Sequence, residues 1–168
     1  MANFATTRVA EALRTLLRET FEGPAGPSTY FIDNDPQAGL LATIDRLSSA
    51  EASHPTRPGG ATIAAHADHV AFHLEVSDAW IRGDRDPRDW SLSWIAHEVD
   101  EAGWSRIRRR VRRGYEELIR TIENESGAVD GSLETAIAAA VHAAYHLGAI
   151  RQRVAAADWS GADRKRET

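Results

Sequence analysis

The sequence contains no cysteine, and it lacks several other features that direct a chain to a particular class of protein. Without cysteine it can form no disulfide bond, and no thiolate of its own can act as a nucleophile or as a metal ligand. No stretch of about 18 apolar residues is present, so the sequence predicts no membrane span. Residues 1–8 lack the basic and then apolar layout of a signal peptide, and we therefore expect a cytoplasmic location.

An excess of basic residues is also missing. Lys and Arg number 20 against 25 Asp and Glu, which leaves a formal charge of −5 and no general attraction to nucleic acid or to an anionic membrane. The run of arginines between Arg106 and Arg113 is an exception, but acidic residues such as Glu101 and Glu116 lie on both sides of it. We interpret this run as a solvated helix face with ion pairs within the helix. The sequence thus predicts neither a nucleic-acid partner nor a membrane partner.

The apolar residues recur at helical spacing between segments rich in glycine and proline, and β-branched runs are scarce. This pattern predicts an all-α protein that forms one domain over residues 1–168, with about ten residues at the C-terminus as a flexible tail. We expect four long helices that pack as a four-helix bundle, a short helix, and a tryptophan-rich loop. The predicted helices cover residues 4–22, 37–48 (the short one), 62–81, 102–125 and 132–157, and the loop covers residues 84–102.

Histidine is the remaining residue with a borderline-soft metal ligand, and two pairs of histidines have the spacing i, i+4 that places both members on one side of a helix. The first pair is His69 and His73, with His66 one turn earlier, and the second is His142 and His146. The helical winding puts the first three on the apolar face of their helix, where an imidazole without a partner would be costly. Imidazoles from two facing helices can bind one divalent metal ion.

Two interpretations of these histidines remain open. In the first, three neutral ligands leave one coordination position free, and the ion activates an external thiol or a water molecule for transfer or hydrolysis. In the second, the histidines are ordinary core residues with hydrogen-bond partners, and the protein is a non-catalytic metal-binding or purely structural helical module. Arg153 lies roughly along the direction of His142 and His146, two turns further on, and is a candidate for contact with a substrate.

The segment 136–150 contains no charged residue and is apolar almost all round except for its two histidines. We therefore expect the helix over residues 132–157 to be the most buried one of the bundle. Its outward side needs cover, which either the short helix over residues 37–48 or a second copy of the chain can supply. Both kinds of cover remain open at this point, and symmetric homodimers are the commonest oligomers.

Two stretches resemble a known family. The run RPGGATIAAHADHV over residues 57–70 and the run HAAYHLG over residues 142–148 are similar to motifs of the DinB/YfiT-like superfamily, and the resemblance extends from about residue 39 to residue 152. Members of this family are often dimeric, so we favour a second copy as the cover of the helix over residues 132–157. The resemblance also implies a bundle with an up-down-down-up arrangement, to which this chain adds a short helix near its N-terminus. It also implies a nickel or zinc ion held by His69, His142 and His146. His66 is the alternative to His69, and both His66 and His73 would be near neighbours of the ion.

The resemblance further implies a reaction. Relatives of known activity are transferases or isomerases that act on small molecules and use a low-molecular-weight thiol such as mycothiol or bacillithiol. A thiol delivered from outside suits a chain that has no cysteine of its own. In one respect the sequence departs from the family, which commonly has glutamine directly after the glycine at Gly148, where this chain has Ala149. A polar partner near the metal is therefore missing or is supplied from elsewhere.

Overall fold

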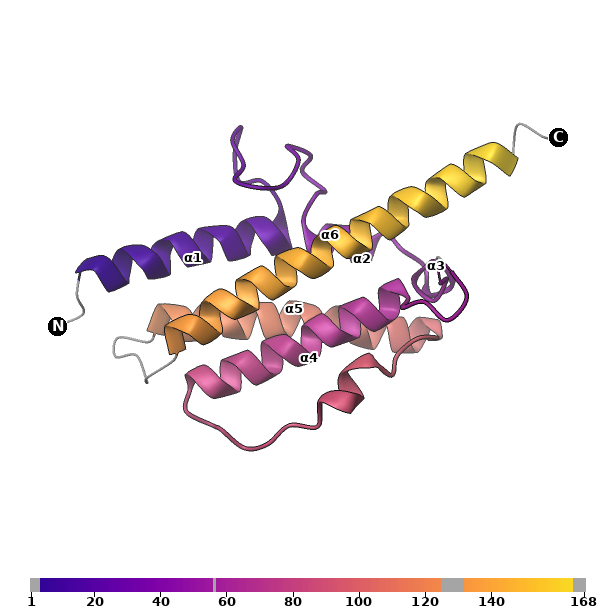
Figure 1. The fold of residues 1–168 in the computed structure, drawn as a ribbon. Helices are drawn as coiled ribbons and strands as arrows, with labels where there is room; N and C mark the ends of the chain where they lie inside the picture. Colours follow the sequence, from indigo (N-terminus) through magenta and orange to yellow (C-terminus); the bar gives the residue numbers. More distant parts are fainter. Residues whose placement is uncertain (1–3, 56, 125–131, 165–168) are drawn as a thin grey trace.

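The computed structural model describes residues 4–55, 57–124 and 132–164, and over these ranges it is all-helical, as predicted (Figure 1). The elements are α1 (Phe4–Glu22), α2 (Leu40–Asp45), α3 (Ser49–Ala52), α4 (Ile63–Ile81), η1 (Trp90–Trp94), α5 (Glu101–Asn124) and α6 (Ser132–Arg164). No helix in these ranges is long and apolar enough to cross a lipid bilayer. The long helices α1, α4 and α5 begin and end within about two residues of the predicted bounds, as expected for helix ends.

The prediction for residues 37–48 was wrong in its extent. The helix there is only α2, because the turn at Asp35, whose carboxylate accepts a hydrogen bond from the Gln37 N–H, holds the residues before Leu40 outside the helix. A second short helix, α3, follows in a stretch where the sequence analysis predicted no helix. Its signal was the S-x-x-E capping box, in which Ser48 and Glu51 satisfy each other's backbone N–H groups.

Helix α4, and not α6, is the most buried long helix. It packs against both α5 and α6, and its polar residues Asp68 and Asp78 are buried together with its apolar ones. Helix α6 keeps an exposed stripe, made of Ile137, Val141 and Tyr145. The predicted burial of α6 was therefore wrong, because a helix at the edge of the packing turns only one side toward its neighbours. Helix α2 packs chiefly against α1 and α5, so it leaves this stripe of α6 uncovered.

The end of α6 also differs from the prediction. The helix continues to Arg164, beyond the predicted end at residue 157. The predicted tail falls on the last turns of this helix and on residues 165–168, which lie outside the described residues.

The arginine run lies on α5 and forms most of its ion pairs with other elements rather than within its own helix. Arg110 reaches α4, where it pairs with Asp68 and, at 2.8 Å, with Glu75. Arg112 pairs with Asp45 of α2 at 2.7 Å. The expectation of a charged face holds, but its main partners are the neighbouring helices, so these pairs join α5 to α2 and α4.

The long connection between α1 and α2 is fixed by one carboxylate. Glu19 is buried, and its side chain accepts hydrogen bonds from the backbone N–H groups of Tyr30, Phe31 and Ile32. Arg151 of α6 pairs with a further residue of this connection, Asp33. The connection projects from the helices in Figure 1, yet its middle is tied to them by polar contacts.

Candidate metal centre

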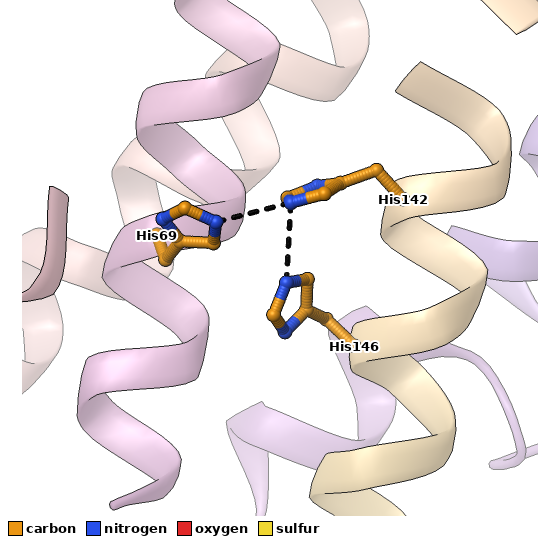
Figure 2. Close-up of side chains that lie close together, drawn as sticks. All are labelled: His69, His142 and His146. Carbon is orange, nitrogen blue, oxygen red and sulfur yellow. Dashed lines mark hydrogen bonds between the residues drawn. The ribbon is translucent and has the colours of Figure 1, made fainter. Parts of the chain in front are cut away.

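Helix α4 supplies the first group of histidines, and its start is fixed by Thr62. The Thr62 hydroxyl oxygen accepts a hydrogen bond from the Ala65 N–H and donates one to the carbonyl oxygen of His97. This cap sets the first residue of the helix, and the helical winding then turns His69 toward α6 (Figure 2). His66 faces the same way, since its Nδ1 atom lies 2.8 Å from Nδ1 of His146. Both of these α4 side chains are buried, and both lie on the apolar face that the sequence predicted.

Helix α6 supplies His142 and His146, which lie one turn apart on the side that faces α4 (Figure 2). Small residues on the same helix, Ala139 and Ala143, are almost fully buried and allow the two helices to approach closely. His146 is only 2% exposed, whereas His142 is half-buried. The two histidine groups that the sequence placed on separate helices therefore meet in space.

Three imidazoles turn the same ring nitrogen, Nε2, toward one another. The Nε2 atom of His142 lies 3.0 Å from that of His69 and 3.2 Å from that of His146 (Figure 2). Each of the three residues offers a ligand atom within 4.8 Å of the others. A tetrahedral zinc site with Zn–N distances of 2.0–2.1 Å has its nitrogens about 3.3 Å apart. The two separations from His142 are therefore close to those of a shared divalent ion, and the third pair lies within the 4.8 Å bound.

Hydrogen bonding alone does not account for this arrangement. Burial, together with the neighbouring imidazoles, lowers the pKa of His142 and of His146 to about 3, and burial lowers the pKa of His69 as well. The rings are therefore neutral near pH 7, and a neutral ring nitrogen carries either one proton or one lone pair. The Nε2 atom of His142 can thus form only one good hydrogen bond with its two partners, whereas one ion can accept all three lone pairs.

The outer ring nitrogens of His69 and His146 each have a hydrogen-bond partner, as those of metal-binding histidines usually do. Ser93 donates its hydroxyl proton to the carbonyl oxygen of Trp90 at 2.7 Å, so its oxygen is free to accept the Nδ1–H of His69 at 2.9 Å. That proton position leaves the lone pair of His69 on Nε2. On the other helix, Nδ1 of His146 lies 2.8 Å from Nδ1 of His66. Second partners of this kind fix the orientation of a ligand ring.

The other predicted neighbours, His66 and His73, lie beside the three rings. His73 stacks on His142 with 3.8 Å between the ring centres, and its Nδ1 lies 3.3 Å from the hydroxyl oxygen of Ser77. Burial lowers the pKa of both His66 and His73 to about 4. Five neutral imidazoles thus form one cluster between α4 and α6.

Two residues of η1 belong to this cluster, and sequence reasoning missed both as site residues. Trp94 stacks on His69, with ring centres 4.1 Å apart and 22° between the planes, and it meets His66 edge to face. Ser93 is the hydrogen-bond partner described above. The loop has no helical period that could relate it to the histidines. The one available signal was the unusual density of tryptophan in the predicted loop over residues 84–102.

Arg153 lies two turns beyond His146 on α6, as the sequence indicated. Its guanidinium donates hydrogen bonds to the carbonyl oxygens of Ala61, at 3.2 Å, and Ala149, at 3.0 Å. Within the described part of the chain its partners are carbonyl oxygens, and none of the ion pairs includes it. Its positive charge contributes to the low pKa of His66, after the larger effect of burial.

The remaining histidines, His54 and His97, lie elsewhere. They line a surface cavity of about 690 Å³ together with residues that include Gly60 and Thr62. Among the described residues, the triad that brings three ligand atoms together is His69, His142 and His146. Compared with models of known protein families, with curated proteins and with solved structures, the chain has no significant match.

Proposed function

We propose that the chain is a divalent-metal-binding protein of the DinB/YfiT-like type, and that it is a metal-dependent enzyme. His69, His142 and His146 would hold the ion through Nε2. The observation that carries the proposal is the convergence of the three imidazoles, in which Nε2 of His142 lies within hydrogen-bond distance of the Nε2 atoms of His69 and His146, and the outer nitrogens of His69 and His146 already have partners. The course of the four long helices in Figure 1 supports the up-down-down-up bundle that the resemblance implies.

The donor set supports a choice of metal. Three neutral imidazole nitrogens suit zinc and nickel, and neither thiolates nor carboxylates are among the three ligands. Three ligands leave a coordination position free, which is the pattern of catalytic rather than structural zinc sites. A divalent ion bound there would lower the pKa of a thiol or of a water molecule and so supply a nucleophile at neutral pH.

The residues around the ion have separate tasks in this proposal. Ser93 and His66 orient the ligand rings of His69 and His146 through their Nδ1 atoms. Trp94 covers His69 with its ring plane and keeps water from that side. The thiol would come from a low-molecular-weight cofactor, since the chain has no cysteine, and a small molecule would be the substrate. Hydrolysis by activated water is the competing reaction.

The first prediction tests the metal. Protein purified without a histidine tag should contain nickel or zinc by elemental analysis. Returning either ion to chelator-stripped protein should raise its melting temperature, because the ion binds the folded state alone. At a hundredfold excess over Kd the rise should be on the order of 5–10 °C. His142→Ala should abolish the rise, and His54→Ala, outside the cluster, should keep it. A stripped wild-type protein that melts at the same temperature with every divalent ion would refute the site.

The nature of the nucleophile has its own test. Adding glutathione to the nickel-loaded protein should produce a near-ultraviolet thiolate-to-nickel charge-transfer band if the free position accepts a thiol. The His142→Ala variant, treated in the same way, is the control. The wild-type protein without such a band, but with metal in place, would favour water as the nucleophile.

A further inference from the structure

Two polar groups beside the triad have hydrogen-bonding capacity that the protein leaves unused. His66 is only 5% exposed, and its Nε2 atom is buried without a hydrogen-bond partner. Arg153 is half-buried, and its guanidinium is held by two carbonyl oxygens instead of a carboxylate. An unsatisfied buried ring nitrogen is costly, and buried cations usually have an anionic partner. Both groups therefore call for a partner from outside the chain.

The proton on His66 can be located, and this step rests on the proposed function. When Nε2 of His146 gives its lone pair to a metal ion, the proton of that ring lies on Nδ1. Nδ1 of His66, 2.8 Å away, must then be the acceptor. The single proton of a neutral His66 ring consequently lies on Nε2, which is the buried atom without a partner. The unused group is thus a hydrogen-bond donor.

The local charge selects the kind of acceptor. The three proposed ligands are neutral, so a bound divalent ion would keep its full charge, and Arg153 adds another positive charge nearby. Its guanidinium lies at the start of α4, where it donates to the carbonyl oxygen of Ala61, and His66 is in the first turn of that helix. Guanidinium and imidazole N–H groups bind carboxylate and phosphate oxygens with charge-assisted hydrogen bonds. An oxyanion would satisfy the donor of His66 and balance part of the positive charge.

A surface cavity lies beside the segment that Arg153 contacts. Ala61, whose carbonyl oxygen accepts from Arg153, lies in the sequence between Gly60 and Thr62, and these two residues line the cavity of about 690 Å³. Cavities of this size bind small molecules. Arg153 follows His146 by two helical turns, about 10 Å along α6. The guanidinium of Arg153 covers part of this distance, because it donates to the carbonyl oxygen of Ala149, one turn nearer His146.

We propose that Arg153 and the Nε2–H of His66 form an oxyanion subsite beside the metal centre, and that the substrate is a small molecule carrying a carboxylate or a phosphate group. The anionic group is held at this subsite, and the reacting part of the molecule points toward His142 and His146. Arg153 sets the specificity for an anionic substrate. His66 has two roles: its Nδ1 atom orients the ring of His146, and its Nε2–H binds the anion.

The test is calorimetric titration of the zinc-loaded protein with acetate, inorganic phosphate and acetamide, which is the neutral counterpart of acetate. We expect at least one of the two anions to bind, and acetamide not to bind. The anion with the higher affinity identifies the group that the substrate carries. Arg153→Gln should weaken anion binding by about tenfold to a hundredfold. Arg153→Lys, which keeps the charge, should lose less. Arg151→Gln is the matched control, because Arg151 is on the same helix but pairs with Asp33.

The variant His66→Asn separates the two ring nitrogens. Asparagine keeps an acceptor near the position of Nδ1 but has no group that reaches the position of Nε2. We expect its zinc content to match the wild type while its anion affinity falls. Anion affinity that is equal in wild type, Arg153→Gln and His66→Asn, or no anion binding by zinc-loaded wild type, would overturn the subsite and leave the metal centre standing. A wild-type protein that takes up no zinc would overturn both, and elemental analysis distinguishes these cases.

Discussion

At Ser93 a single hydroxyl group determines which nitrogen of His69 faces the other imidazoles. Its proton goes to the carbonyl oxygen of Trp90, so its oxygen accepts from Nδ1 of the ring. This partner lies in a loop without periodicity, and nothing in the sequence relates it to His69. The histidines themselves were predictable, because a spacing of three or four residues fixes a shared helix face. Their outer-nitrogen partners were not, since side-chain hydrogen bonds across a fold follow from tertiary packing.

A second prediction concerns the choice between His69 and His66. His69→Ala removes one of three converging Nε2 atoms, and we expect the variant to lose the ion completely. His66→Ala removes only the partner of His146, and changes of this kind lower metal affinity by roughly 10- to 100-fold. Competition with a chromophoric chelator measures the metal affinity of both variants. Metal retained by His69→Ala and lost from His66→Ala would reverse the assignment.

A third prediction is a loss of stability in acid. The pKa of His66 and of His73 is about 4, and that of His142 and of His146 is about 3, all below the value of about 6.5 in an unfolded chain. Between these values the unfolded state binds protons that the folded state does not. The free energy of unfolding must therefore fall as the pH falls below about 6.5.

Urea unfolding of the metal-free protein at pH 7, 6 and 5 measures the slope of the unfolding free energy against pH. A variant with His73→Phe, which keeps a ring on His142, should have a shallower slope than the wild type, whereas His54→Gln, outside the cluster, should match the wild type. Constant stability between pH 7 and pH 5 would contradict the prediction.

At the scale of the elements, the sequence predicted the long helices well and their burial poorly. A continuous apolar period specified α1, α4 and α5 almost to the residue. The absence of charge over residues 136–150 pointed to a buried α6, yet Val141 and Tyr145 are exposed. Conversely, the charged residues Asp68 and Asp78 of α4 are buried, and Arg110 and Thr121 of α5 pair with them. A charge on one helix is neutralised by its neighbour, and a single sequence does not show which helices are neighbours.

A fourth prediction tests the contact between the end of α1 and the start of α2. A Cβ atom on Gly39 would lie 2.6 Å from the Glu22 carbonyl carbon and 2.7 Å from the Phe21 oxygen. These are backbone atoms that cannot turn aside, so Gly39→Ala should cost about 1–3 kcal/mol of stability or more. Gly26→Ala is the control, because a Cβ there meets nothing within 4 Å. Urea denaturation should give Gly26→Ala a stability within about 0.5 kcal/mol of the wild type. Equal stability of the two variants would show that the contact is looser than described.

At the scale of the whole molecule, the exposed stripe of Ile137, Val141 and Tyr145 supports the proposal of a homodimer. Within the described chain α2 does not cover this stripe, so the alternative in which the short helix of the same chain covers α6 has lost its support. As a fifth prediction, light scattering at micromolar concentration should give twice the mass of the chain. Val141→Lys should shift the mass toward the monomer, and Val9→Lys, an exposed valine on α1, should not. A monomer mass for the wild type, unchanged by added zinc, would contradict the dimer.

The carboxylate of Glu19 has a consequence for the entropy of the chain. Residues 23–39 would form a long connection if only its two ends were fixed, and long connections without secondary structure are uncommon in small domains. By holding the backbone at residues 30–32, Glu19 divides this connection into two short loops, so the ordering of each is independent of the other. Tyr30 and Phe31 can then remain exposed without loss of order, because backbone hydrogen bonds to Glu19 hold their positions.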